Sequence, residues 1–541
     1  MDRFDYVIIG AGSAGSVLAN RLTEDGQHRV LLLEAGGRDW HPYIHLPIGY
    51  GRVYYDERIN WKFLTAPVPG LGGKPSYWPR GKVLGGSSSI NGMVYMRGHP
   101  GDFEDWAEVA PGWGWEDVEP AFRKLERWSG PPSQARGSHG PLPVSNITAE
   151  VHETCRNFLD ASREAGFVEI ADHNGTELEG TSVYQMTTLG GLRASAARCW
   201  LTPAKGRKTL EIRTHAHVCG LVFEDNRAVG VRYRQGGHEA EVRASRSVIL
   251  SAGAVGSPQI LQLSGLGPAA VLAAHGVPLR REMPHIGQHL QDHLGVDYIY
   301  RSRVPTLNQR LRPWIGRIAA ALRFATSRRG PLTIGVNHAG GFVRSDPALE
   351  RPDVQLYYSP LSYTKAPPGT RPLLTPDPFP GLMIGHSPCR PTSEGHVNIA
   401  SSDPEAPPDI QPAYLSTDQD RAVMRAGIRI MRRIAAQPSM ASIIDALLSP
   451  GAEEEDDESL DAFARDNGWT VFHPSCTCRM GHDPASSVVD PRLRLHGARG
   501  LRVVDASVFP NITSGNINAP TLMLAERAAA MILEDAKEGH R

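Results

Sequence analysis

The chain opens on short hydrophobic runs separated by turns and by an amphipathic stretch. Residues 4–9 (FDYVII) form an apolar, β-branched-rich run that predicts a strand buried on both faces. Residues 13–22 carry small and then apolar side chains at helical spacing, and residues 29–33 (RVLLL) predict a second buried strand. The order strand, helix, strand therefore predicts a βαβ unit, which is the building block of a parallel sheet.

Three glycines occupy the turn between the first strand and the helix. Gly10, Gly12 and Gly15 give the spacing G-x-G-x-x-G, in which the first permits a tight turn, the second lets the backbone approach a pyrophosphate, and the third lets the helix pack against the strand. Glu34 ends the second strand about twenty residues after Gly15, where a carboxylate accepts hydrogen bonds from ribose hydroxyls. These features predict a site for an adenine dinucleotide without a 2′-phosphate, either FAD or NAD.

The pattern of strand, turn and helix recurs later in the chain, and a different hydrophobic pattern separates its later occurrences. Residues 246–265 predict a strand, a tight turn and a helix, and residues 501–507 predict a strand that precedes a helix from about residue 518. Between residues 298 and 465 the pattern gives way to alternating runs that predict an antiparallel sheet with helices behind it. The hydrophobic pattern thus predicts an α/β nucleotide-binding domain assembled from separate segments, and a second, α+β domain.

Composition and charge exclude several classes of protein. The 541 residues are 40% hydrophobic and 21% charged, as in soluble globular proteins, and the net charge of −1 provides no overall field to attract nucleic acid. The longest apolar runs are too short for a membrane span, and the first strand begins too early to leave room for a secretory signal. We expect a cytoplasmic protein with no integral membrane segment, with peripheral contact with the inner membrane left open.

The cysteines raise the question of a metal site. Six cysteines in a chain of this length do not form a disulfide framework, but Cys476 and Cys478 lie close to His473 and His482. Cys-x-Cys is an uncommon spacing for structural zinc, and no second cysteine pair follows. We therefore expect reduced thiols and no metal.

Six longer segments carry a resemblance to one family. They are GKVLGGSSSINGMVYMRGHPGDFE (81–104), GAVGSPQILQLSGLG (253–267), HIGQHLQDH (285–293), FHPSCTCRMG (472–481), LRVVDASVFP (501–510) and GNINAPTLMLAERAAAMI (515–532). They resemble the signatures of the glucose–methanol–choline (GMC) oxidoreductases, and especially of the choline-dehydrogenase-like alcohol dehydrogenase group. The similarity extends from residue 4 to about residue 535.

The resemblance implies FAD as the cofactor. In some relatives a histidine of the second glycine-rich loop is bonded to the flavin, and Ile90 stands at that position here, so the FAD is expected to be non-covalent. The residues that the family's pattern implies for the pyrophosphate, the AMP ribose and the adenine are Gly10, Gly12, Ser13, Ala14, Gly15, Glu34, Ala35 and Val218. Those that it implies for the rest of the FAD are Gly85, Ser89, Asn91, Gly92, Met93, Val94, Asp505, Ala506, Asn516, Pro520 and Thr521.

The resemblance also implies the residues that carry the chemistry. The first residue of the family's H-P-x-G-T pattern, a base, corresponds to His473, and its partner in the last helix corresponds to Asn518. A histidine has a pKa near neutrality without further tuning, and an asparagine can donate to a developing alkoxide. Asn518 has the alternative role of capping the last helix. Cys476 replaces the glycine of the pattern and is expected to narrow the pocket, and His293 is expected to be structural.

The resemblance implies domains and an activity. The FAD-binding, Rossmann-like domain comprises residues 1–150, 185–297 and 466–541, and the substrate domain comprises residues 151–184 and 298–465. The implied reaction is the oxidation of a primary alcohol to an aldehyde, with electrons passed to a quinone or another carrier. Oxidation by O₂ with release of H₂O₂ is the alternative. A lyase or a fatty-acid photodecarboxylase is more remote, because the decarboxylase pattern lacks the base that His473 provides, and a flavoprotein without turnover is a third class.

Overall fold

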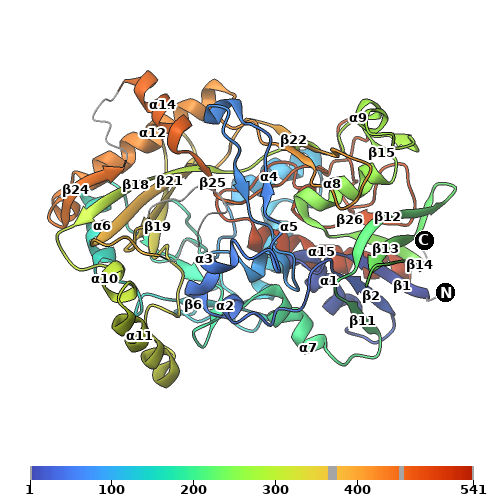
Figure 1. The fold of residues 1–541 in the computed structure, drawn as a ribbon, viewed down its shortest axis with the longest axis horizontal. Helices are drawn as coiled ribbons and strands as arrows, with labels where there is room; N and C mark the ends of the chain where they lie inside the picture. The colour runs from blue at the N-terminus through green and yellow to red at the C-terminus, as the bar shows by residue number, and fades with distance from the viewer. Residues whose placement is uncertain (1–2, 364–374, 450–455, 539–541) are drawn as a thin grey trace.

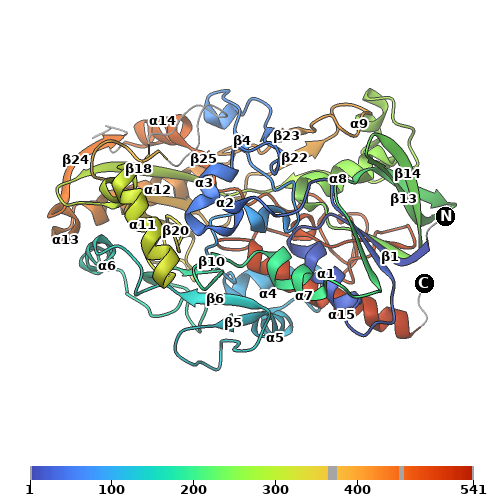
Figure 2. The ribbon, with the colours of Figure 1, turned by 60° about the horizontal axis from the view of Figure 1, so that its bottom comes forward.

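The molecule consists of two halves, each built on one large β-sheet (Figures 1 and 2). The fold is that of a computed structural model, which describes residues 3–363, 375–449 and 456–538. The first sheet lies in the half that contains both termini, and the second lies in the opposite half. The long helix α15 (Asn518–Lys537) belongs to the first half, as the hydrophobic pattern predicted.

The first sheet has the strand order β11-β2-β1-β14-β13-β12, with β26 paired to β14. Its strands are β1 (Arg3–Ile9), β2 (Val30–Leu33), β11 (Leu210–Arg213), β12 (His217–Glu224), β13 (Arg227–Gln235), β14 (His238–Leu250) and β26 (Leu501–Val503). β11, β2, β1, the end of β14 and β26 run parallel, whereas β12, β13 and the start of β14 form an antiparallel meander. Within this sheet β2 (VLLL) is fully buried, and its continuously apolar sequence suits a parallel strand that is covered on both faces.

Helices bring their N-termini to the carboxyl ends of these parallel strands. α1 (Ser13–Leu22) follows β1 through the glycine turn, and α8 (Gly253–Leu263) follows β14 in the same way. α15 packs along α1, and its buried face is made of Ala, Leu and Met side chains. Helix N-termini gathered at one sheet edge present backbone N–H groups to an anion, so this edge is the natural place for a pyrophosphate.

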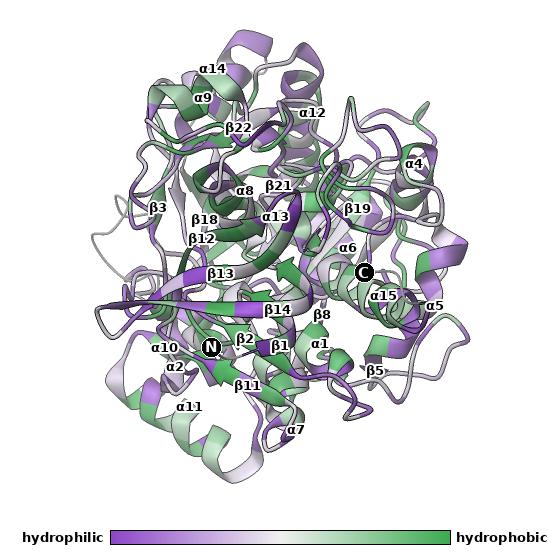
Figure 3. Cartoon of the chain, turned by 90° about the vertical axis from the view of Figure 1, so that its right-hand side faces the viewer, coloured by the Kyte–Doolittle hydropathy of each residue, from purple (hydrophilic) through white to green (hydrophobic). Residues whose placement is uncertain are grey.

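The second sheet is antiparallel, with the strand order β24-β18-β21-β20-β19-β7 and β25 paired to β18. Its strands are β7 (Gly180–Val183), β18 (Leu294–Ser302), β19 (Ala339–Val343), β20 (Val354–Ser359), β21 (Gly381–Pro388), β24 (Ile444–Ser449) and β25 (Trp469–Thr470). Helices cover one of its faces, namely α6 (Thr154–Glu164), α12 (Asp418–Ala435) and α13 (Pro438–Ala441). In Figure 3 hydrophobic residues colour α8 and much of β2, whereas β14 carries several hydrophilic residues.

The fold class, an FAD-type α/β domain with a separate antiparallel-sheet domain, is as predicted from the sequence. β18 crosses the predicted boundary at residues 297 and 298, and β25 pairs with the second sheet from a segment assigned to the first domain. The predicted domain boundaries therefore remain an approximation to where the chain passes from one half to the other.

Shorter elements connect and cover the two halves. The helices are α2 (Pro42–His45), α3 (Tyr50–Val53), α4 (Pro100–Val109), α5 (Trp115–Leu125), α7 (Thr202–Ala204), α9 (Ala269–Ala274), α10 (Leu307–Leu311), α11 (Trp314–Ser327) and α14 (Asp457–Asn467). The strands are β3 (Phe63–Leu64), β4 (Tyr77–Trp78), β5 (Glu126–Trp128), β6 (Leu142–Asn146), β8 (Gln185–Met186), β9 (Thr188–Leu189), β10 (Leu192–Arg193), β15 (Leu266–Gly267), β16 (Arg281–Glu282), β17 (Gln288–Leu290), β22 (Gly395–Asn398) and β23 (Asp409–Gln411). Across the described ranges, no helix combines the length and the apolar character needed to cross a bilayer.

Candidate active site

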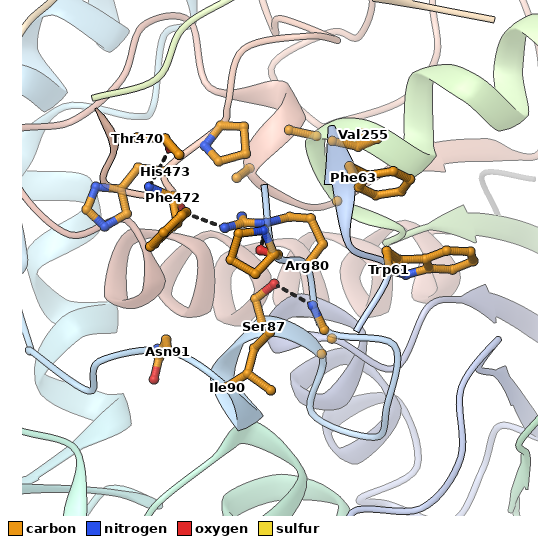
Figure 4. Close-up of a pocket in the computed structure, with 18 of the residues that line it drawn as sticks. Trp61, Phe63, Arg80, Ser87, Ile90, Asn91, Val255, Thr470, Phe472 and His473 are labelled. Carbon is orange, nitrogen blue, oxygen red and sulfur yellow. Dashed lines mark hydrogen bonds between the residues drawn. The ribbon is translucent and has the colours of Figure 1, made fainter. Parts of the chain in front are cut away.

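A cavity of about 740 Å³ runs from the glycine turn after β1 to the side chain of His473. Figure 4 shows His473 and Phe472 on one side of it, Ile90 and Asn91 on the other, and Arg80 between them. Most of the residues predicted to bind FAD or to act in catalysis line this one cavity: Gly10, Gly12, Ser13, Ala14, Glu34, Ala35, Asn91, Gly92, Met93, Val94, Val218, His473, Asp505, Ala506, Asn516, Asn518 and Thr521. The tertiary structure thus brings together segments from both ends and the middle of the chain.

The glycine turn has the shape that a bound pyrophosphate requires. Gly10 has a φ of +96°, and a Cβ there would lie 2.5 Å from the carbonyl oxygen of Ser251. A Cβ on Gly15 would lie 1.9 Å from the Gly10 carbonyl oxygen, so both positions exclude any side chain. A Cβ on Gly12 would meet nothing closer than the Cα of Gly86, at 4.0 Å. Gly12 therefore leaves open space within the cavity, where a phosphate can approach the backbone.

This difference between the glycines gives a prediction. Gly12→Ala is expected to give a folded protein that has lost most of its FAD, because the added methyl group occupies space reserved for the pyrophosphate. Gly15→Ala is expected to prevent folding, because its methyl group overlaps the Gly10 carbonyl. The visible flavin absorbance per mole of purified protein, together with far-UV circular dichroism, separates the two outcomes. A fully yellow Gly12→Ala protein would contradict the assignment of the phosphate turn.

Glu34 lies at the end of β2, as predicted, and its carboxylate faces the cavity. It accepts hydrogen bonds from the backbone N–H groups of Ala11, at 2.9 Å, and Gly36, at 2.8 Å. Burial raises the pKa of Glu34 to about 7, although those two hydrogen bonds and Lys82 oppose the rise. A carboxylate held rigidly at this place can accept hydrogen bonds from the hydroxyls of an adenosine ribose. The buried carboxylate and the open phosphate turn fit FAD.

The second glycine-rich loop forms the opposite wall. Gly86 has a φ of +53° and approaches Gly12 so closely that a Cβ on it would lie 2.6 Å from the Gly12 Cα. Asn91 is fixed by Arg193, whose Nη1 donates to its Oδ1 at 2.6 Å. Ile90 lines the cavity and carries no group that could bond covalently to a flavin. This wall suits a non-covalent flavin.

Four of the predicted residues pack behind the cavity wall instead of lining it. They are Gly15, Gly85, Ser89 and Pro520. Their roles are structural: the Ser89 hydroxyl donates to the Leu84 carbonyl at 2.8 Å, and Pro520 is buried in the first turn of α15. Conversely, the sequence analysis did not assign Gly86, although it is adjacent to the predicted Gly85 and belongs to the same Gly-Gly pair.

His473 lies between a second histidine and an amide. Its Nδ1 is 2.9 Å from Nδ1 of His293, and its Nε2 accepts a hydrogen bond from Nδ2 of Asn516 at 3.1 Å. The other ring nitrogen of His293, Nε2, is 2.8 Å from the carbonyl oxygen of Cys389. His293, which the sequence analysis expected to be structural, is thus the direct neighbour of the candidate base.

These contacts determine where the protons lie. A carbonyl oxygen can only accept, so Nε2 of His293 carries the proton and its Nδ1 is an acceptor. Nδ1 of His473 must then carry the proton that it donates to His293, which leaves Nε2 of His473 unprotonated. The unprotonated nitrogen is the one on the Asn516 side. The chain thus fixes His473 in the tautomer of a base.

The amide partner of His473 is Asn516 and not the predicted Asn518. Gln355 on β20 donates to Oδ1 of Asn516 at 3.5 Å, so the Asn516 amide nitrogen is turned toward His473. The carbonyl oxygen of the Asn518 side chain instead accepts a hydrogen bond from the Ser13 hydroxyl at 2.7 Å. The pairing of Asn518 with His473 was wrong, because residues two apart at a helix start point in different directions. Asn518 is also not the N-cap of α15, since Ile517 occupies that position.

The environment of His473 weakens it as a base relative to an ordinary histidine. Burial, His293 and Arg80 together hold the pKa of His473 well below 6.5. The sequence analysis expected a pKa near neutrality without tuning. That expectation was wrong because the His473 imidazole is buried and lies near the cation of Arg80. Arg80 donates to the carbonyl oxygen of Phe472 at 2.7 Å, so its guanidinium is tied to the loop that carries His473.

Asp292 holds that loop in place. One of its carboxylate oxygens accepts from the backbone N–H of His473 at 2.6 Å, and the other accepts from the hydroxyls of Thr470, at 2.6 Å, and Tyr414. Burial raises the pKa of Asp292 to about 6. The segment HIGQHLQDH therefore supports His473 through two consecutive residues, one bonded to its backbone and one to its ring.

The cysteines of the H-P-S-C-T-C segment lie away from the cavity. Cys476 has a φ of +74°, in the left-handed region that favours glycine, and its thiol contacts Ser475 and Gln291. The expectation that Cys476 narrows the pocket was therefore wrong. His482 is turned to the carbonyl oxygen of Val109. Within residues 3–363, 375–449 and 456–538, no three His, Cys, Asp or Glu side chains are arranged to hold a metal ion.

Asp505, also predicted, closes the cavity from the side of β26. Its carboxylate accepts from the Ser257 hydroxyl at 2.6 Å and from the backbone N–H of Gly253 at 2.9 Å. Both donors belong to the start of α8, so Asp505 joins the β14–α8 segment to the end of the chain. Burial raises the pKa of Asp505 above 3.8.

Comparison with known proteins agrees with this geometry. The chain matches models of the GMC oxidoreductase family over residues 4–295 and 391–525. It is 42% identical to an alcohol dehydrogenase (acceptor) of Pseudomonas putida, covering 98% of this chain and 96% of the relative. It is 39% identical to an oxygen-dependent choline dehydrogenase of Photobacterium profundum, covering 98% and 93%. The solved structure of formate oxidase from Aspergillus oryzae, studied for its FAD modification, superimposes with a TM-score of 0.92 at 27% identity, covering 99% of each chain. The chain belongs to the GMC oxidoreductase family, as its motifs predicted, and its cofactor is FAD.

Proposed function

We propose that the protein oxidises a primary alcohol to an aldehyde, with FAD as the hydride acceptor and His473 as the base. One observation carries the proposal: the unprotonated Nε2 of His473 and the amide of Asn516 meet at 3.1 Å in the cavity that also contains the phosphate turn. A base and a hydrogen-bond donor at one point are the groups that removal of a hydroxyl proton requires.

In the proposed reaction the alcohol oxygen binds in the cavity within hydrogen-bond reach of both groups and replaces the direct hydrogen bond between them. Its hydroxyl proton points to Nε2 of His473, and its lone pair accepts from Nδ2 of Asn516. The proton passes to Nε2 as the C–H bond breaks, and the two electrons of that bond leave with the hydrogen as hydride. FAD, when bound, supplies the acceptor for this hydride. The carbon is left as an aldehyde, so proton, hydride and product account for all the atoms of the alcohol group.

His293 influences the fate of the proton that His473 takes up from the alcohol. Once Nε2 of His473 is protonated, the ring is a cation whose Nδ1–H still donates to neutral His293. The causes that keep the pKa of His473 low, namely burial, His293 and Arg80, favour rapid release of the proton after the reaction. The same causes make it a weak base, so we infer that loss of the proton and loss of the hydride are closely coupled.

The cavity beside His473 suits an alcohol with an apolar or aromatic body. Its wall there includes Tyr54, Tyr357, Tyr363 and Phe472. Tyr357 donates to the side-chain oxygen of Gln355 at 2.8 Å, which in turn fixes Asn516, so part of this aromatic wall also orients the catalytic amide. An apolar pocket with few convergent polar groups is the usual form of a small-molecule site.

The electron acceptor distinguishes two forms of the proposed activity. We propose a quinone or another carrier as the acceptor, in keeping with the name of the P. putida relative, alcohol dehydrogenase (acceptor), and we propose a cytoplasmic location. The oxidase among the structural neighbours supports O₂ as the alternative. Anaerobic reduction of a dye by alcohol, compared with aerobic formation of H₂O₂ by the same preparation, decides between them.

The two asparagines provide a sharp test of the site. Asn516→Ala is expected to slow flavin reduction by alcohol by roughly 10²- to 10³-fold, because it removes the donor to the developing alkoxide. Asn518→Ala is expected to leave the rate within a few-fold of wild type and to weaken FAD retention, because its side chain holds Ser13 of the phosphate turn. Stopped-flow bleaching of the flavin measures the first effect, and FAD content after gel filtration measures the second. Slow flavin reduction in Asn518→Ala together with weak FAD retention in Asn516→Ala would overturn the role of Asn516.

A further inference from the structure

α11 (Trp314–Ser327) carries its large hydrophobic side chains on the outside of the molecule. Trp314 is 70% exposed, Ile315 63%, Ile318 50% and Leu322 61%. Ile315, Ile318 and Leu322 follow one another at steps of three and four residues, and Trp314 is four residues before Ile318, so the four form one continuous face of the helix. A contiguous exposed apolar face on a folded protein marks a surface that contacts something else.

The opposite face of α11 fixes this orientation. Gly316, Ala320 and Phe324, each four residues apart, are the positions that turn inward, and only Ala320 is fully buried. A Cβ on Gly316 would lie 2.1 Å from the carbonyl oxygen of Arg310, so the glycine lets α11 lie against the end of α10. The helix therefore packs through a narrow stripe formed by Gly316, Ala320 and Phe324, and the exposed apolar residues cannot turn inward without displacing this stripe.

The charged residues of α11 and of the segment around it are basic. Residues 298–345 contain no Asp or Glu, whereas Arg317 and Arg323 flank the apolar face and Arg328 and Arg329 follow the helix. Among the residues that the structure describes, the acidic groups within ion-pair distance of the arginines of α10 and α11 and of the two that follow are Glu150, 3.7 Å from Arg329, and Glu153, 3.9 Å from Arg310. Within the same described ranges no acidic side chain pairs with Arg317 or Arg323, so the flanks of the face stay positively charged.

We propose that the apolar face of α11 is a binding surface for an anionic lipid bilayer. An interfacial helix lies in the plane of the membrane with its aromatic and aliphatic side chains among the acyl chains and its basic residues at the headgroups. Trp314 lies at the start of the face, and tryptophan is enriched at the interface between a membrane and water. The helix protrudes at the edge of the molecule (Figure 1), so a flat surface can reach it without obstruction.

Charge and shape favour a bilayer over a second copy of the chain. A symmetric dimer through this face would bring Arg317 and Arg323 of the two copies toward each other, which is unfavourable. The face is also convex, because a single helix stands out from the body, whereas a protein partner for it would need a matching groove. Anionic headgroups around a fluid apolar layer complement both the charge and the shape.

The position of α11 relates this surface to the cavity. Ala320 packs in the same apolar cluster as Tyr54 and Ile90, which line the cavity. A bilayer bound to α11 would therefore lie on the same side of the molecule as the cavity wall that contains Tyr54 and Ile90. If the proposed alcohol oxidation holds, this places a lipid-soluble electron acceptor or an amphiphilic alcohol close to the site, but lipid binding itself does not depend on that activity.

Flotation of the FAD-loaded protein with vesicles tests the proposal. We expect binding to vesicles of phosphatidylcholine with phosphatidylglycerol, weak binding to phosphatidylcholine alone, and a decrease at high salt. The triple variant Ile315→Gln, Ile318→Gln, Leu322→Gln should lose binding at least 100-fold, since glutamine keeps the helix but not the apolar face. Arg317→Gln with Arg323→Gln should weaken it about 30-fold.

Matched controls and a second measurement make the result decisive. The double variant Val168→Gln, Leu279→Gln removes exposed apolar side chains outside α11. The double variant Lys205→Gln, Lys208→Gln removes two positive charges outside α11. Each double variant should bind the vesicles as the wild type does. Flavin absorbance and alcohol-driven flavin reduction should be unchanged in every variant, which separates this test from that of the proposed function. Absence of wild-type binding, equal binding by the triple variant, or a dimer in sedimentation that the triple variant dissociates would overturn the proposal.

Discussion

His473→Ala is expected to retain FAD and to reduce it with alcohol at least roughly a thousandfold more slowly than wild type. The substitution removes the imidazole whose unprotonated nitrogen faces Asn516, and general-base catalysis accounts for a factor of this order. FAD is retained because the phosphate turn, Glu34 and the loop around Asn91 lie at other parts of the cavity. Stopped-flow bleaching under anaerobic conditions measures the rate constant directly.

A second pair of histidines offers the control for this experiment. His285 and His289 also make a ring-nitrogen contact, at 3.0 Å, but they lie outside the cavity. His285→Ala and His289→Ala should bleach at the wild-type rate, which excludes a general effect of deleting an imidazole. Reduction of the His473→Ala protein within tenfold of wild type would remove His473 from the role of base.

Lowering the pH from about 7 to about 5 is expected to destabilise the folded protein by several kcal/mol. Six buried histidines have a pKa below the ordinary value: His152, His173, His293, His338, His386 and His473. Burial lowers the pKa of the first three to about 4, lowers those of His338 and His386 to about 3, and holds that of His473 well below 6.5. In the unfolded chain each recovers a pKa of about 6.5, so unfolding takes up protons as the pH falls below that value.

Buried carboxylates act in the opposite direction and reduce the net effect. Burial raises the pKa of Glu34 to about 7, of Asp292 to about 6, and of Asp505 above its ordinary value, so the native state binds protons there before the unfolded state does. Setting Glu34 and Asp292 against the five histidines whose pKa is about 3 or 4 leaves about three protons taken up on unfolding near pH 5. Each is worth about 1.4 kcal/mol per pH unit, so the free energy of unfolding falls by about 4 kcal/mol per pH unit in that range.

Urea unfolding of the FAD-loaded protein at several pH values measures this slope. His386→Leu removes one buried ionisable group of β21 and should flatten the slope by about 1.4 kcal/mol per pH unit. His238→Leu, at an exposed position, should leave it unchanged. A free energy of unfolding that does not vary between these pH values would show that the buried histidines are protonated in the native state.

The sequence predicted the parts of the site that depend on local geometry. The run of β1, the glycine turn, α1, β2 and Glu34 follow one another within about thirty residues, and each step has a local cause: apolar runs form buried strands, and glycines permit the turn. The roles of Gly10 and Gly15 follow from the same causes, and the overlap of a Cβ at either position confirms them. The burial of particular histidines could not be predicted, because it depends on which elements pack over them.

The two asparagines of the closing segment show where local prediction ends. Asn516 and Asn518 are two residues apart, and both are plausible partners for a base on sequence alone. Gln355 on β20 orients the first toward His473, and Ser13 on α1 engages the second. Both partners are distant in the chain, so the assignment depends on the packing of the two halves of the molecule.

By itself the sequence determined the family, the cofactor, the nucleotide-binding turn and the identity of the candidate base, because these reside in short segments whose residue types have direct physical consequences. Only the tertiary structure decided which amide faces His473, that His293 fixes its tautomer through the Cys389 carbonyl, and that α11 turns its apolar face outward. These properties depend on hydrogen bonds and contacts between segments far apart in the chain, and the direction in which a side chain points is set by what packs beside it.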